Sequence, residues 1–301
     1  MFRLGVVSAI ALSLFSALGT ASAQELNFAN SEEIITTLGY QEAEVSATPD
    51  GVSAPETLEA GYSLVTLNGD DANAAYLNIV QYPADLDEAT AVEQALLAGA
   101  GDMPQEGWTY FGGTNTPELG DPATFAINLE PGEYHWAVSY YEPYTGGGDS
   151  EEFMHLIPLT VTEGEAEAAA PEVTVTLEMT DELQYIVTPD PVPTGPHIWE
   201  ITNTGTVHAH HVVIFSTPDD VTAQDIIGEF NAMMSGTPMA GEPLMAQFGG
   251  GAYAALQSGG PTTWAEFNFE PGTYAVICFI LDPETGRPHV LDGMVTSFTV
   301  E

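Results

Sequence analysis

Three side chains that could bind a soft metal ion lie close together near the C-terminus. Cys278, the only cysteine of the chain, falls on an apolar run that is predicted to form a strand over residues 274–281. A turn-rich loop follows and ends at His289, and Met294 stands five positions further on. Thiolate, imidazole and thioether are the donors of a distorted copper site, with His and Cys in a trigonal plane and a weak axial Met. This stretch therefore predicts most of a copper site.

The second imidazole of such a site must come from elsewhere in the chain. Residues 208–215 carry His208, His210 and His211 at the start of an apolar, β-branched run. Alternate residues of a strand share a face, so His210 and His211 point to opposite sides, and the periodicity leaves both open as the ligand. His208 is expected to be a solvated turn residue.

This arrangement resembles the cupredoxin, or blue-copper, family. The resemblance covers residues 173–301 and rests on the order Cys, loop, His-x4-Met, on the upstream histidine strand, and on the Glu-Pro-Gly-x-Tyr turn at 270–274. Ten residues separate the cysteine from the loop histidine, which is more than the small electron carriers of the family have. The resemblance implies one copper ion with four ligands: His210, Cys278, His289 and Met294.

The other potential donors are interpreted through the same resemblance. The family has a ligand His, one polar residue and then an apolar run, which favours His210 as the ligand and puts His211 in the polar position. His197 has no matched role. Apart from the resemblance, four methionines could offer thioethers to Cu(I), but such residues more often fill an apolar lid. We expect a lid that keeps the copper shell dry and so tunes its reduction potential; the four are Met233, Met234, Met239 and Met245.

The N-terminus has the features of a targeting segment. A short basic start is followed by an apolar stretch over residues 4–18 and by Ala21-Ser22-Ala23, a small-x-small cleavage site. This pattern is typical of a secretory signal peptide over residues 1–23, and the apolar stretch is too short to span a bilayer as a helix. We expect a soluble protein in the periplasm or outside the cell.

The charge balance is extreme. The chain has 44 acidic residues against 2 basic ones, which gives a formal net charge of −42. Such self-repulsion destabilises a compact state in dilute buffer, whereas molar salt shortens the screening length to about 3 Å. We interpret this as adaptation to a saline, halophilic environment. Since no basic patch can form, we expect no binding to nucleic acid or to anionic membranes.

The chain is predicted to be a tandem duplication. Residues 128–134 (NLEPGEY) recur as 268–274 (NFEPGTY), and the Phe-Gly-Gly of 111–113 recurs at 248–250. This divides the chain into a first domain over 41–162, an acidic, Ala-rich linker over 163–171 and a second domain over 172–301. The donor positions of the second copy fall in the first on Ala75, Tyr76, Val138, Asp149 and Met154, so the first copy is predicted to be degenerate and to bind no metal.

Short β-branched runs separated by Gly, Pro, Asn and Asp fill both copies. This pattern predicts an all-β fold of two cupredoxin-like Greek-key β-sandwiches. One helical insertion is expected in each copy, over 88–97 in the first and over 222–234 in the second, where apolar residues recur on one face. With 44% hydrophobic and 10% aromatic residues, each copy has material for a core.

The leading functional hypothesis is an exported type 1 copper protein that carries single electrons and exchanges them with a redox partner protein. The alternatives are capture, storage or delivery of copper without redox work, and a metal-free β-sandwich used for interaction. A multicopper oxidase or nitrite reductase is disfavoured, because those enzymes have a His beside the copper Cys and the neighbours here are Ile277 and Phe279.

Overall fold

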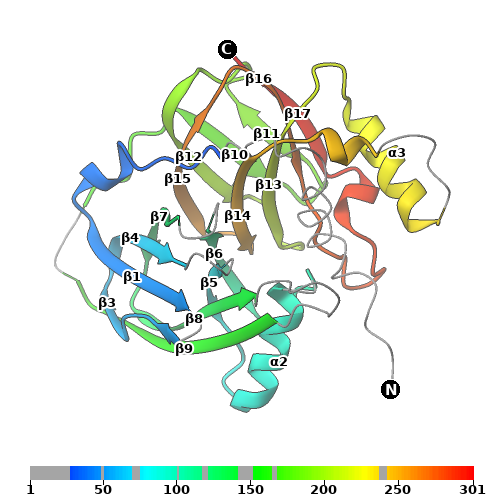
Figure 1. Ribbon diagram of the computed structural model, residues 1–301. Coiled ribbons are helices and arrows are strands. Elements are labelled where there is room, and N and C mark those ends of the chain that lie inside the picture. The colour runs from blue at the N-terminus through cyan, green and yellow to red at the C-terminus, as the bar shows by residue number, and fades with distance from the viewer. Residues whose placement is uncertain are drawn as a thin grey trace.

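The computed structural model describes residues 28–48, 51–69, 75–99, 102–116, 121–141, 152–164, 168–236 and 243–301. The predicted signal peptide, residues 1–23, lies outside these ranges, as does part of the predicted linker. The described chain is mostly strand, with one α-helix in each half (Figure 1). None of the helices in the described part is long and apolar enough to cross a membrane.

The strands fall into two sets along the chain. The N-terminal half contains β1 (Gln41–Thr48), β2 (Gly51–Ser53), β3 (Thr57–Glu59), β4 (Gly61–Asn68), β5 (Ala75–Gln81), β6 (Thr109–Asn115), β7 (Ala123–Leu129), β8 (Gly132–Tyr141) and β9 (Glu152–Thr162). The C-terminal half contains β10 (Val175–Met179), β11 (Tyr185–Thr188), β12 (Gly195–Asn203), β13 (His210–Thr217), β14 (Gly251–Gln257), β15 (Thr262–Phe269), β16 (Gly272–Ile277) and β17 (Val295–Val300).

These strands form two sheets that each run through both halves. One has the order β11-β10-β12-β15-β7-β4-β1-β2, and the other has the order β17-β16-β13-β14-β6-β5-β8-β9-β3. The halves meet where β15 pairs with β7 and where β14 pairs with β6. The predicted all-β class, with one helical insertion in each half of the described chain, is confirmed.

The strand order is nearly symmetric about the junction between the halves. Phe125 pairs with Ala265 there, and these two residues occupy equivalent positions in the repeated sequence. Registers also correspond within the halves, since Asn78 pairs with Ala137 on β5 and β8 just as Val213 pairs with Ile277 on β13 and β16. The two halves thus use equivalent strands in equivalent places. The exact domain boundaries stay a prediction.

The two helices flank one sheet. Helix α2 (Glu88–Gly99) lies beside β8 and β9, and α3 (Ala223–Met234) lies beside β17 (Figure 1). Thr222 caps α3 with a reciprocal capping box, in which its hydroxyl accepts from the Asp225 N–H and the Asp225 carboxylate accepts from the Thr222 N–H. This satisfies donors that the first turn leaves free. The buried face of α3 contains Ile226 and Phe230.

The segment before β1 forms hydrogen bonds with both halves of the chain. The Ala29 N–H donates to the Gly251 carbonyl, and the Thr124 hydroxyl donates to Glu32. The buried Glu266 carboxyl group accepts the N–H groups of residues 33, 34 and 35 at 2.7–3.0 Å and the Ser31 hydroxyl at 2.7 Å. It thereby satisfies donors at the start of the 3-10 helix η2 (Ile35–Leu38), which has no side-chain cap of its own.

We predict that Glu266→Ala destabilises the protein by about 2–4 kcal/mol, because the substitution leaves several buried N–H groups without an acceptor. Chemical denaturation of the full chain in molar salt measures this change. The matched control is Glu270→Ala, an exposed acid four residues further along. An equal, small effect of both substitutions would contradict the role assigned to Glu266.

Candidate metal centre

The backbone around Cys278 departs from the predicted strand. Strand β16 ends at Ile277 and not at Leu281, so the prediction over residues 274–281 is wrong at its C-terminal end. Beyond Ile277 the chain bonds to the returning end of its own loop. The Val290 N–H donates to the Cys278 carbonyl and the His289 N–H to the Ile280 carbonyl, both at 2.9 Å. These bonds bring His289 back to Cys278 across the ten intervening residues.

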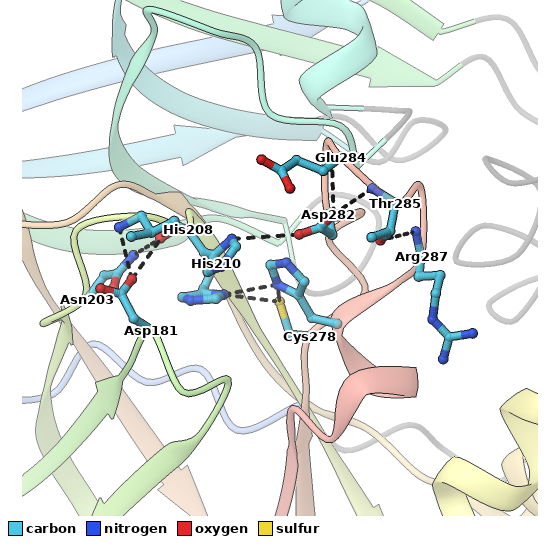
Figure 2. Close-up of polar contacts among 11 residues, drawn as sticks. Asp181, Asn203, His208, His210, Cys278, Asp282, Glu284, Thr285 and Arg287 are labelled. Carbon is cyan, nitrogen blue, oxygen red and sulfur yellow. Dashed lines mark hydrogen bonds and ion pairs between the residues drawn. The ribbon is translucent and has the colours of Figure 1, made fainter.

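Three of the predicted ligands converge. The Nδ1 atoms of His210 and His289 lie 3.1 Å apart. The Sγ atom of Cys278 lies 3.5 Å from Nδ1 of His289 and 3.9 Å from Nδ1 of His210 (Figure 2). All three side chains are buried, with at most 1% of each exposed. One nitrogen or sulfur from each residue therefore faces a common point, as a metal site requires.

The fourth predicted ligand, Met294, lies directly before β17. Its N–H donates to the His289 carbonyl at 2.9 Å, and its own carbonyl accepts the Cys278 N–H at 3.2 Å. Its side chain is fully buried and belongs to the same core cluster as Cys278. Main-chain hydrogen bonds thus connect all three donors of the C-terminal segment.

The structure distinguishes the two neighbouring histidines. His210 opens β13 and faces Cys278 and His289, whereas His211 points to the other side. The Nε2 atom of His211 accepts the Phe279 N–H at 2.8 Å, and its Nδ1 atom lies 3.8 Å from Asp102. His211 therefore supports the backbone just after the cysteine.

His208 is not the solvated turn residue that the sequence suggested. Its Nδ1 atom lies 4.0 Å from an oxygen of Asp282, and less than a quarter of its side chain is exposed. Its ring centroid is 5.4 Å from that of His289. His208 and Asp282 thus extend the group of donors toward the surface.

An apolar cluster packs against the two ends of the loop between Cys278 and His289, whereas residues 283–287 in the middle of the loop are exposed. The ring centroids of Phe230 on α3 and Phe279 lie 5.4 Å apart, and Val290 packs in the same cluster. Of the predicted lid methionines, Met245 is buried in this cluster and Met233 packs against it, whereas Met234 is 42% exposed and Met239 lies outside the described residues.

Burial sets the protonation of the donors. It lowers the pKa of His210 to about 3, helped by the neighbouring His289, and lowers the pKa of His289 to about 4, helped by His208. Burial also raises the pKa of the Cys278 thiol to about 12. At neutral pH the site therefore holds two neutral imidazoles, which is the form that binds metals, and a thiol that must lose its proton to become a ligand.

The unpaired atoms and the donor types test whether a metal fits. The Nε2 atoms of His210 and His289 are buried and have no hydrogen-bond partner within the described part of the chain. Buried polar atoms normally have partners, and exceptions often mark a functional site. The atoms that face Cys278 are the Nδ1 atoms, however, so the fit of a metal to the buried site depends on the donor types. Two imidazoles with a thiolate and a thioether are the donors of a type 1 copper site. The residues present therefore fit copper.

Two of the equivalent positions in the N-terminal half, Ala75 and Val138, are apolar. Ala75 opens β5 as His210 opens β13, and Val138 follows Ala137 as Cys278 follows Ile277. Both Ala75 and Val138 are buried in a hydrophobic core. The position predicted to match His289, Asp149, lies outside the described residues. At Ala75 and Val138 this half offers a metal ion no donor.

Comparison with known proteins gave likenesses to copper proteins. No model of a protein family matches the sequence, and no curated protein matches it. Among solved structures, an auracyanin from Roseiflexus castenholzii has 22% identity and a TM-score of 0.26 over 43% of this chain and 99% of its own. Auracyanin A from Chloroflexus aurantiacus, a "blue" copper protein, has 20% identity and a TM-score of 0.26 over 42% and 98%.

A longer likeness involves an enzyme. The Cu-containing nitrite reductase from Thermus scotoductus has 12% identity and a TM-score of 0.23 over 87% of this chain and 61% of its own. Because these identities and TM-scores are low, the likenesses carry no argument about the function of the chain. The function has to be inferred from the geometry of the chain's own site. In its two-sheet, all-β fold and its buried donors at His210, Cys278, His289 and Met294, the chain resembles the cupredoxins.

We predict that each metal ion bound between about pH 5 and 8 displaces one proton, because the thiol is protonated and both imidazoles are neutral in this range. The affinity should therefore rise about tenfold per pH unit. Titration calorimetry of the full chain with Cu(II), repeated in buffers of different ionisation enthalpy, counts the protons. A count of zero would show that Cys278 is not a ligand.

Proposed function

We propose that the protein is an exported, mononuclear copper protein that holds one ion with His210, Cys278, His289 and Met294 and carries single electrons. The observation that carries this proposal is the convergence of one thiol and two imidazoles, from segments far apart in the chain, on one buried point. Copper bound there would supply a one-electron couple. Export is inferred from the signal-like residues 1–23.

The surroundings of the thiol favour electron transfer over chemistry on a substrate. Hydrogen bonding from the main chain at His211 and Ile280 and from the Tyr185 side chain acts to lower the pKa of Cys278, against the larger effect of burial, which raises it. The Tyr185 hydroxyl also donates to the His211 carbonyl. Hydrogen bonds and apolar packing around the cysteine sulfur tune the reduction potential of such sites. Because these groups are fixed by the fold, they hold one arrangement of donors for both oxidation states.

A protein partner is the expected source and acceptor of the electrons. The chain has 44 acidic and 2 basic residues, so a partner with a basic docking face would be steered toward it at low ionic strength. Molar salt would largely remove this steering. The same acidity is the reason to propose no binding to nucleic acid or to anionic membranes.

Copper capture and delivery is the second candidate function. The half-buried pair of His208 and Asp282 favours capture and delivery, because these two side chains could bind an ion near the surface, next to the buried donors. We do not propose an oxidase or a reductase. Ile277 and Phe279, which flank Cys278, offer no ligand to a second copper centre, and the two potential metal groups in the described chain share His289.

We predict that Cu(II) added to the full chain in molar salt produces an intense visible band from thiolate-to-copper charge transfer. Cys278→Ser and His210→Ala should each abolish this band, because each removes a ligand from the trigonal plane. His211→Asn is the matched control on the next residue. It should keep the band while lowering the free energy of unfolding by about 1–3 kcal/mol, since the Phe279 N–H loses its acceptor.

The spectra separate the alternatives. If the band survives in His210→Ala and is lost in His211→Asn, the ligand assignment is wrong. Binding of copper without the band in the unmodified chain would exclude the type 1 site and leave capture as the function. No binding at all would leave a metal-free interaction protein.

We further predict that copper stays bound through repeated reduction and reoxidation in the presence of a Cu(I) chelator. A carrier needs one donor arrangement for both oxidation states, and burial of all three converging ligands restricts escape of the ion. The measurement is the band intensity after each cycle. Stepwise transfer of copper to the chelator on reduction would favour delivery over electron transfer.

A further inference from the structure

A second group of potential ligands lies outside the buried donors. His208, Asp282 and His289 can each offer one atom within 4.8 Å of the others. The His208 and Asp282 side chains, which a dashed line joins in Figure 2, are 23% and 17% exposed. The His289 side chain is buried. This outer group and the buried group of His210, Cys278 and His289 have one residue in common. His289 therefore stands between the surface and the thiol.

Both outer residues sit on segments that hydrogen bonds hold in place. Asp181 accepts the N–H groups of Thr206 at 2.8 Å and Val207 at 2.9 Å, just before His208. The Asn203 side chain donates to the His208 carbonyl at 2.8 Å. On the other side, Asp282 accepts two N–H groups of its own loop at 2.7 and 3.0 Å through one oxygen, while its second oxygen faces His208.

The outer donors have a different chemical preference from the inner ones. Two imidazoles and a carboxylate suit divalent ions such as Cu(II) and Zn(II), whereas the thiolate of the inner group is a soft ligand. A metal site also needs an entry path, and the buried group is at most 1% exposed. The Nε2 atom of His289 is buried without a partner within the described chain, so this ring retains a donor for an ion outside the thiol site.

We propose that His208, Asp282 and His289 form an outer site for a divalent transition-metal ion, from which the ion passes inward to His210 and Cys278. His289 is common to both sites. In the transfer the ion exchanges its bonds to His208, Asp282 and Nε2 of His289 for bonds to His210, Cys278 and Nδ1 of His289. The ring proton of His289 passes from Nδ1 to Nε2, the thiol proton leaves to solvent, and no electron moves. The inward step rests on the proposed function, whereas the outer site can be tested without it.

The test of the transfer is the rate at which copper reaches the thiol. The full-chain apoprotein in molar salt is mixed rapidly with Cu(II) sulfate, and growth of the thiolate-to-copper band is followed. Loss of a supporting ligand commonly costs ten- to a hundredfold at metal sites. We therefore expect His208→Asn and Asp282→Asn each to slow the band about tenfold or more. His197→Asn, on β12 and outside both groups, is the control and should match the unmodified chain.

A second measurement tests the outer site apart from the thiol. In Cys278→Ser, paramagnetic resonance of added Cu(II) should reveal a bound ion without a thiolate ligand, and adding His208→Asn should weaken its affinity about tenfold. If the unmodified chain gives no band but this result is found, the proposed function fails and the outer site stands. Equal rates for His208→Asn and His197→Asn would overturn the inward transfer, and equal affinities with and without His208 would overturn the outer site.

Discussion

Everything at the candidate centre depends on the main-chain hydrogen bonds that close the segment from Cys278 to Met294 on itself. Cys278 accepts from Val290 and donates to Met294, and His289 accepts from Met294 in turn. These bonds fix three donor residues relative to one another without using their side chains. Closing a longer loop costs little additional entropy, so the ten residues between Cys278 and His289 lengthen the loop without displacing its ends. His210 then needs only the pairing of β13 with β16 to join them.

The chain as a whole is strongly acidic, whereas the buried side chains of the candidate metal centre are neutral. The chain has 44 acidic residues, but the buried donors carry no charge in the apoprotein at neutral pH, because burial lowers the pKa of both imidazoles and raises the pKa of the thiol. The apoprotein therefore avoids burying an unpaired ion, which would be costly. Glu266 is a buried acid, and four hydrogen-bond donors surround it.

The sequence allowed much of the centre to be predicted, because the spacing of Cys278, His289 and Met294 is local. The sequence pattern placed the end of the strand at Leu281, because Phe279, Ile280 and Leu281 are all apolar. These residues are buried by packing and lie beyond the end of strand β16. The role of His208 was missed because its neighbour Asp282 lies 74 positions away in the sequence. The all-β class followed from composition and pattern, but the continuous sheets across β7 and β15 depend on a long-range pairing that no local pattern signals.

X-ray absorption at the copper edge tests the central claim most directly. The full chain loaded with one equivalent of copper in molar salt should show one short sulfur scatterer and two imidazole nitrogens, and Cys278→Ser should lose the sulfur. A copper ion surrounded only by nitrogen and oxygen in the unmodified chain would contradict the account. It would mean that His210, Cys278 and His289 converge as packed core residues and that the ion binds elsewhere.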